Sequence, residues 1–275
     1  MLKLKDKRKI LIFNLKTQIF KEKIYFDKSN FRRELSSEAD VIQLNLNNNL
    51  FLLSGKESNK FYFYNYNTNS ILYINSSLYS HYYGVMLFCK KNNKIYLLGG
   101  NNQKNCESYS LKNINNQQKK IKKKWKTIPS LNEERQEFGS MIYNDDYLYV
   151  FFGFSHIKGV NLNNIERMDI NTHEKFEIVY VNEHITLSSI GCAILSDEIE
   201  YNSDGGILLL GGFDGEKYIE TSLVFSPKQM KIRECDIIIP NISKHFQFLF
   251  HKETNFIQID NDLQVVFDMK IMYIF

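Results

Sequence analysis

The sequence predicts an all-β protein made of repeated four-stranded units. Two short phrases alternate along the 275 residues of the chain. One is an apolar run that ends in glycine, and the other is an aromatic or apolar residue followed by a short polar residue. Phrases that alternate in a fixed order are typical of repeat architectures. The composition agrees, because 43% hydrophobic and 14% aromatic residues are typical of a globular chain rich in strands.

The glycine phrase predicts the second strand of each unit. It occurs at 51–55, 95–100, 149–153 and 207–212, and its last glycines lie 45, 53 and 59 residues apart. An unbroken apolar run is expected for an inner strand that neighbouring units cover on both faces. Apolar runs that precede them at 84–88, 139–143 and 190–195 predict the first strands.

The aromatic-polar phrase predicts the third strand of each unit and the turn after it. The short polar side chain can hydrogen-bond to the backbone of a tight turn. The phrase begins at six residues, which are Phe13, Tyr64, Tyr109, Met168, Phe225 and Phe267.

Two stretches contain glycines, aromatic residues and charged residues in a definite order. In one, the Gly-Gly-Phe-Asp-Gly segment at 211–215 precedes Tyr218, Leu223 and Phe225. In the other, Trp125, Pro129 and Arg135 precede the runs 139–143 and 147–153. Both stretches resemble the kelch-repeat family of the galactose-oxidase-like propeller superfamily. The resemblance implies a kelch-type β-propeller of about six four-stranded blades, in one domain of residues 1–275, with the N-terminal blade incomplete. The expected blades span 1–38 (partial), 39–80, 81–128, 129–182, 183–239 and 240–275. The expected structural repeat residues are Gly55, Gly99, Gly100, Gly153, Gly211, Gly212 and Trp125.

The two ends of the chain do not complete one another in this prediction. Residues 10–20 are expected to form the third and fourth strands of a blade without its first two strands. The last blade is expected to supply its own strands at 246–250, 256–260 and 264–275. Either Met1 lies inside a longer protein, or the first blade is a two-stranded remnant.

A non-catalytic protein–protein interaction scaffold or adaptor is the expected function. The resemblance implies a binding mouth lined by the second-to-third-strand loops and the inter-blade loops. In this chain these are 56–60, 101–105, 154–160, 213–217, 79–83, 131–138 and 183–188. The residues expected to be exposed there and to bind the partner are His81, Tyr82, Arg135, Phe154, His156 and Asp214. The partner is an unidentified protein, with cytoskeletal and ubiquitin-ligase components as the classes considered, and no cofactor is expected.

An enzyme that binds a sugar or small acid at the central mouth is the alternative. His81, His184 and His245 each precede a first strand, so a ring of histidines at one mouth is geometrically possible. No histidine pair has the spacing of a zinc enzyme, and polar residues are common in such connections. The Tyr, Cys and two-His set of the copper radical oxidases in this superfamily cannot be assembled. No metal site is therefore expected.

The lack of targeting signals and the cysteine content favour a cytoplasmic protein, and the charge favours no particular partner. The net charge is +4, and much of it comes from the basic run at 119–126. That run is interpreted as a solvated insert in preference to a nucleic-acid site. The start of the chain has no secretory pattern, and no segment reaches membrane-spanning length. The four cysteines have no metal or redox spacing and are expected to be reduced.

Overall fold

The computed structural model describes much of the chain, and all of its regular secondary structure is β. The described residues are 2–6, 9–14, 19–24, 42–47, 50–54, 59–65, 70–100, 102–111, 124–195, 206–219, 221–238, 249–250, 255–259 and 264–268. No helix occurs in these ranges, so none of the described segments could cross a membrane as an apolar helix. The expected all-β class is confirmed for the described residues.

Four antiparallel sheets of four strands make up most of the described structure. The β4–β7 sheet contains β4 (Ile42–Asn47), β5 (Leu50–Ser54), β6 (Phe61–Asn65) and β7 (Ser70–Ile74). The β8–β11 sheet contains β8 (Val85–Cys89), β9 (Lys94–Leu98), β10 (Cys106–Ser110) and β11 (Lys126–Ile128). The β12–β17 sheet contains β12 (Gly139–Tyr143), β13 (Tyr147–Phe151), β16 (Asn164–Asp169) and β17 (Glu177–Val181). The β18–β21 sheet contains β18 (Gly191–Leu195), β19 (Gly206–Leu210), β20 (Thr221–Ser226) and β21 (Lys231–Ile238).

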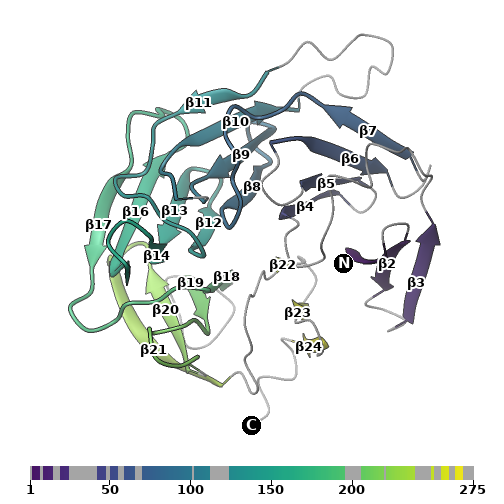
Figure 1. Cartoon of the computed structure of the whole chain (residues 1–275). Coiled ribbons are helices and arrows are strands. Elements are labelled where there is room, and N and C mark those ends of the chain that lie inside the picture. The colour runs from purple at the N-terminus through teal and green to yellow at the C-terminus, as the bar shows by residue number, and fades with distance from the viewer. Residues whose placement is uncertain are drawn as a thin grey trace.

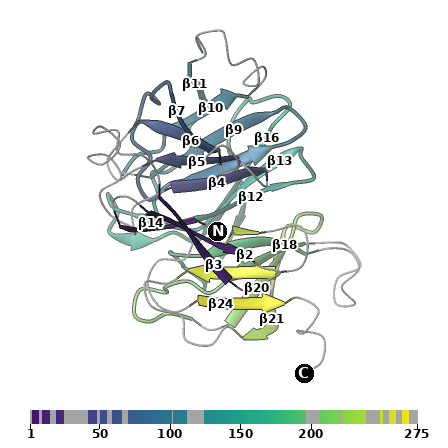
Figure 2. The same cartoon turned by 90° about the vertical axis from the view of Figure 1, so that its right-hand side faces the viewer.

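The four sheets follow one another along an arc, as Figure 1 shows. In each sheet the strands run outward in chain order, and Figure 2 shows β4 to β7 one above another in that order. The first strands are neighbours in succession, because β4 contacts β8, β8 contacts β12 and β12 contacts β18. Chain segments at 75–84, 129–138 and 182–190 connect each sheet to the next, and they are called the first, second and third connections below.

Within the described residues, three layers of core side chains lie between successive four-stranded sheets. Strand β9 illustrates this, because Ile95 packs with Phe61 and Trp125 toward the β4–β7 sheet, whereas its neighbour Tyr96 packs with Leu148 toward the β12–β17 sheet. Successive side chains of a strand point to opposite faces, so an apolar run places residues in two layers at once. The unbroken apolar character of the glycine strands therefore follows from their burial on both faces.

The β12–β17 sheet carries an insertion that the sequence did not predict. Strands β14 (Phe154–Ser155) and β15 (Val160–Asn161) form a small hairpin between β13 and β16. This hairpin, residues 154–161, is called the β14–β15 hairpin below. The loop expected at 154–160 is thus a regular structure whose strands pair with each other.

Two three-stranded sheets occur toward the ends of the chain. One contains β1 (Leu2–Asp6), β2 (Lys9–Asn14) and β3 (Ile19–Ile24), and the other contains β22 (Leu249–Phe250), β23 (Asn255–Ile259) and β24 (Gln264–Asp268). The expectation that only two strands lie near the N-terminus is wrong, because β1 pairs with β2. Apolar and charged residues alternate from Leu2 to Lys5 with the two-residue period of a strand. The high lysine content of this segment makes that strand signal easy to overlook.

The expected repeat glycines have the left-handed backbone that favours glycine. Gly99 and Gly100 have φ of 46° and 79°, and Gly211 and Gly212 have φ of 61° and 120°. In the β12–β17 sheet the second glycine is Gly153, but the first position holds Phe152 with φ of 54°. A bulky residue there is strained, and the buried side chain of Phe152 offsets this strain through its packing. Gly55 lies outside the described residues.

Candidate protein-interaction surface

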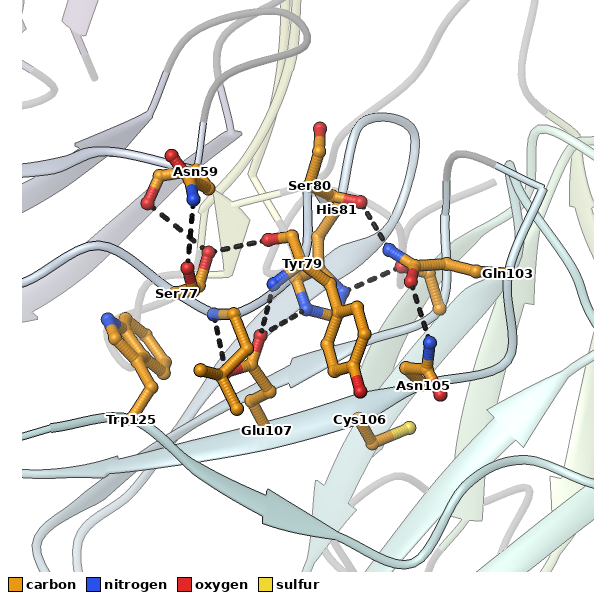
Figure 3. A network of polar contacts seen from close by, with 12 residues as sticks. Asn59, Ser77, Tyr79, Ser80, His81, Gln103, Asn105, Cys106, Glu107 and Trp125 are labelled. Atoms are coloured by element: carbon orange, nitrogen blue, oxygen red, sulfur yellow. Dashed lines mark hydrogen bonds and ion pairs between the residues drawn. The ribbon is translucent and has the colours of Figure 1, made fainter.

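His81 lies in the first connection and is buried against the β8–β11 sheet (Figure 3). Its Nδ1 atom lies 2.7 Å from the carbonyl oxygen of Gly99. Its Nε2 atom lies 3.1 Å from Oε2 of Glu107 on β10, and neither side chain is exposed. The Glu107 carboxylate also accepts hydrogen bonds from the backbone N–H groups of Leu78 and Tyr79, at 2.9 and 3.1 Å. The pair therefore holds the connection onto the third strand of its own sheet.

Further polar contacts hold the start of the same connection. Ser77 donates its backbone N–H to the carbonyl of Asn59 at 2.8 Å, and its hydroxyl donates to the carbonyl of Tyr79 at 2.6 Å. The indole Nε1–H of Trp125 donates to the carbonyl of Asn75 at 2.8 Å. Trp125 is buried between Phe61 and Tyr109, so it packs between two sheets. It is held where the first connection begins.

Arg135 occupies the corresponding place in the second connection. Its guanidinium forms an ion pair with Glu166 on β16 and donates to the carbonyl of Phe152 at 2.8 Å. Asn132, three residues earlier, donates its backbone N–H to Glu166 at 2.9 Å. Leu78 stands at the same offset before His81 and makes the same contact with Glu107. Burial lowers the pKa of the Arg135 guanidinium, and the charge of Glu166 opposes that effect.

The third connection replaces this ion pair with two leucines. Tyr83, Glu137 and Ser189 all have positive φ and mark the equivalent position in the three connections. Glu137 donates its N–H to Tyr83 and Ser189 donates its N–H to Glu137, at 2.9 and 2.6 Å. Two residues before Ser189 stands Leu187, where the other connections have His81 and Arg135.

The residue at the carboxylate position changes together with the basic residue of the connection. Leu223 on β20 corresponds to Glu107 and Glu166, since each precedes the aromatic-polar phrase of its sheet by two residues. Leu187 and Leu223 are buried in the same core layer. His184 stands three residues before Leu187, at the position where Leu78 and Asn132 bond to a glutamate. Its backbone N–H instead donates to the side chain of Asn182 at 2.8 Å. In the three described connections, the basic residue and the carboxylate are thus either both present or both replaced by leucine.

The expectation that His81 and Arg135 are exposed is wrong. Both side chains are fully buried, and their hydrogen bonds join connections to strands. A charged side chain can be buried when a partner of opposite charge and backbone carbonyls satisfy it. These two residues position the loops and are not free to contact a partner.

The β14–β15 hairpin is held by a buried carboxylate that the sequence did not single out. Glu134, in the second connection, accepts the hydroxyl of Ser155 at 2.6 Å and the backbone N–H of Ile157 at 2.7 Å. The N–H of His156 approaches the other carboxylate oxygen at 3.3 Å. Backbone hydrogen bonds in both directions join Phe154 to Gln136. The second connection therefore fixes the hairpin in one geometry.

The tip of the hairpin presents apolar side chains to solvent. Ile157 is 79% exposed and Val160 is 50% exposed. Lys158, between them in the chain, forms an exposed ion pair with Glu133. Asn161 donates to the carbonyl of Phe213 at 2.8 Å, which links the hairpin to the next second-to-third-strand loop. The residues on either side of the exposed tip are thus hydrogen-bonded both to the second connection and to the loop that contains Phe213.

The other expected contact residues differ in their exposure. His156 is exposed on the hairpin, and Phe154 and Tyr82 are half-buried. The carboxylate of Asp214 accepts the N–H groups of Glu216 and Lys217, each at 2.8 Å, so it shapes its own turn. These bonds lower the pKa of the Asp214 carboxyl. Phe154 and His156 lie together with ring centroids 6.4 Å apart.

No metal-binding cluster is present among the described side chains. No group of three His, Cys, Asp or Glu residues converges there. His184 is exposed and stands three residues before Leu187, so it does not occupy the position of His81. His245 lies outside the described residues, as do residues 119–123 of the basic run. A search against protein-family models and a search of curated proteins each found no match for the chain.

Proposed function

We propose that the chain is a kelch-like β-propeller that acts as a non-catalytic protein-interaction scaffold, with the β14–β15 hairpin as its main contact. The propeller proposal is supported by the repeated four-stranded sheets, their adjacent first strands and the side-chain layers between them. The three-stranded sheets near the two ends would contribute the remaining blades of a six-bladed ring.

The exposed Ile157 on a rigid hairpin carries the functional proposal. An isoleucine side chain stabilises a complex by about 1.5–3 kcal/mol when a partner buries it. Flexible loops lose much of such a gain because binding orders them, whereas a preorganised loop does not. Glu134 and Asn161 already fix the hairpin in the free protein. The tip therefore has the properties of an anchor residue in an interface.

The surroundings of Ile157 suit a protein partner. Val160 extends the apolar surface, while His156 and the Lys158–Glu133 pair provide a polar rim. An apolar centre with a polar rim is the usual organisation of a protein interface. A cytoskeletal or ubiquitin-ligase component remains the proposed partner class, in line with the kelch resemblance.

The enzyme alternative lacks an observation in its favour within the described residues. The buried histidine, arginine and carboxylate side chains of the described residues all make structural hydrogen bonds; they are His81, Glu107, Glu134, Arg135 and Glu166. A general acid or base needs access to a substrate. None of these five provides it, so we favour recognition over catalysis.

Affinity capture with two isoleucine variants tests the scaffold proposal. Ile157→Asp should abolish capture of stoichiometric protein partners from the cells that make the protein. Ile178→Asp is the matched control, because Ile178 is 48% exposed but lies on the outer strand β17. Partners retained by Ile157→Asp, or lost equally from both variants, would contradict the hairpin as the contact. Failure of the unmodified protein to capture any partner would contradict the scaffold itself.

A further inference from the structure

A carboxylate and two aromatic rings lie together beside the β14–β15 hairpin. Glu137 belongs to the second connection, whereas Phe213 and Tyr218 belong to the second-to-third-strand loop of the β18–β21 sheet. The rings of Phe213 and Tyr218 have centroids 5.1 Å apart, and an isolated β-bridge joins the two residues. Burial and the negative charge of Glu137 raise the pKa of the Tyr218 phenol, so the carboxylate lies near this ring.

Hydrogen bonds of the third connection hold the carboxylate and the aromatic loop side by side. Ser189 donates its hydroxyl to Oε2 of Glu137 at 2.6 Å and its backbone N–H to the Glu137 carbonyl at 2.6 Å. Ser188 exchanges backbone hydrogen bonds with Phe213 in both directions, at 3.0 and 2.8 Å. Glu137, Phe213 and Tyr218 are half-buried, so this group of three side chains, called the Glu137 site below, is partly open to solvent.

The Glu137 carboxylate retains an oxygen that the fold does not use. Its Oε1 atom makes neither a hydrogen bond nor an ion pair with any described residue, and it is not a buried atom. The backbone does not require a carboxylate here, because Tyr83 and Ser189 have the same positive φ at the equivalent positions. A half-buried negative charge without a basic partner is destabilised by its partial loss of hydration, and a bound cation would offset that loss.

A carboxylate next to aromatic rings favours a cation, and arginine suits this arrangement better than lysine. Aromatic faces attract cations, and the carboxylate repels acidic groups. A guanidinium is planar and weakly hydrated, so it can stack on a ring such as Tyr218 while it donates hydrogen bonds to Glu137. A sugar could also pack on these rings, but its uncharged hydroxyl groups would leave the charge of Glu137 without compensation.

We propose that the Glu137 site binds an arginine side chain of the protein partner that the β14–β15 hairpin contacts. The proposal rests on the proposed scaffold function and adds the chemistry of a second contact. The site and the hairpin are joined, because Gln136 exchanges backbone hydrogen bonds with Phe154 and Asn161 donates to the carbonyl of Phe213. A partner that buries Ile157 can therefore also cover the Glu137 site, and its arginine would fix the orientation of the complex.

Titration of the purified full chain with N-acetyl-arginine amide tests the site without the partner. The NMR signals of Glu137, Ser189 and Tyr218 should shift and saturate, with a Kd of about 1–10 mM for so small a probe. N-acetyl-citrulline amide has nearly the same shape without the charge and should bind at least about tenfold more weakly. Absence of a saturable shift, or equal binding of the two probes, would overturn the proposal. Shifts caused by methyl glucoside but not by the arginine probe would overturn it in favour of a sugar.

Variants of the site identify the groups that bind the probe. Glu137→Gln keeps an acceptor for Ser189 and should weaken binding of the arginine probe about tenfold or more. Tyr218→Leu should weaken it about two- to fivefold, whereas Tyr218→Phe keeps the ring and should bind like the unmodified protein. Glu216→Gln is the matched control, because Glu216 is an exposed carboxylate of the same loop, and it should leave binding unchanged. Equal losses in Glu137→Gln and Glu216→Gln would overturn the proposal.

Failure of this proposal and failure of the scaffold proposal are distinguishable. Capture of a partner through Ile157 by a protein that does not bind the probe would refute the arginine site and leave the scaffold intact. Specific binding of the probe by a protein that captures no partner would support the arginine site and refute the scaffold.

Discussion

Arg135 and Glu166 form an ion pair in which neither side chain has any exposed surface. The pair joins the second connection to β16, and Glu166 also accepts two hydrogen bonds from Asn132. Arg135 is among the largest fully buried side chains of the described structure. The pair therefore ties the connection to the third strand of the sheet that follows it.

Removal of one member of this pair should be much more harmful than removal of both. Glu166→Leu leaves the Arg135 charge buried without its partner and should lower the free energy of unfolding by about 3–5 kcal/mol. The double variant Arg135→Leu with Glu166→Leu reproduces the Leu187 and Leu223 arrangement of the β18–β21 sheet. It should be more stable than Glu166→Leu, although the N–H of Asn132 loses its acceptor. Urea denaturation measures both, and a double variant less stable than the single variant would refute the equivalence of these positions.

Substitution of Glu134 should loosen the β14–β15 hairpin without unfolding the sheets. Glu134→Ala removes the acceptor of Ser155 and Ile157, and hydrogen bonds to a charged group contribute about 1.5–3 kcal/mol. Amide exchange at Ile157 should therefore accelerate at least about tenfold, whereas exchange in β13 should change little.

The neighbouring residue provides the control for this experiment. Glu133 forms an ion pair with Lys158 whose lysine side chain is largely exposed. Glu133 also accepts the side-chain N–H of Asn164 at 3.2 Å, but neither contact holds the backbone of the hairpin. Ion pairs with an exposed lysine contribute about 0–1 kcal/mol, so Glu133→Ala should leave the exchange of Ile157 nearly unchanged. Equal effects of Glu133→Ala and Glu134→Ala would mean that the buried carboxylate does not organise the hairpin.

Two glycines with positive φ should differ in their tolerance of alanine. A Cβ at Gly153, where φ is 102°, would lie 2.7 Å from Cβ of Phe138. A Cβ at Gly159, where φ is 69°, would meet no atom within 4 Å. Gly159→Ala should therefore cost about 1–2 kcal/mol from backbone strain alone. Gly153→Ala adds overpacking and should cost about 3 kcal/mol or more by thermal or urea denaturation. Similar losses at the two sites would contradict the close contact.

The cysteines should react selectively with a thiol reagent. Burial raises the pKa of the Cys106 thiol to about 12 and also raises the pKa values of Cys89 and Cys192. A raised pKa lowers the fraction of thiolate, which is the reactive form, and burial also keeps the reagent away from Cys106. Cys235 is only half-buried and should be labelled first in the folded protein. Mass spectrometry after brief labelling identifies the site, and early modification of Cys106 would show that the β8–β11 sheet opens readily.

The strands could be predicted from sequence because their signals are local. The first strand expected at 139–143 is β12 (Gly139–Tyr143), and the glycine strand at 149–153 contains most of β13 (Tyr147–Phe151). The polar residue of the third-strand phrase also acts as expected in two copies. Asp169 accepts the N–H of Asn171 at 2.7 Å, and Ser226 accepts the N–H of Gln229 at 3.2 Å.

The burial of charged residues could not be predicted in the same way, because each depends on a partner far away in the chain. His81 lies 26 residues from Glu107, and Arg135 lies 31 residues from Glu166. Taken singly, a histidine or an arginine in a connection favours an exposed position. Glu134 was missed for the same reason. Ile157 had a usable signal, since it is an apolar residue among polar and small residues in a predicted loop.

Photochemical crosslinking from the hairpin tests the central claim most directly. A photoreactive amino acid in place of Ile157 lies at the 79% exposed tip, and the same amino acid in place of Ile178 lies on β17. We predict that irradiation in the native cells attaches a defined partner protein at position 157 and none at position 178. Crosslinks at position 178 alone, or at neither position, would contradict recognition through the β14–β15 hairpin.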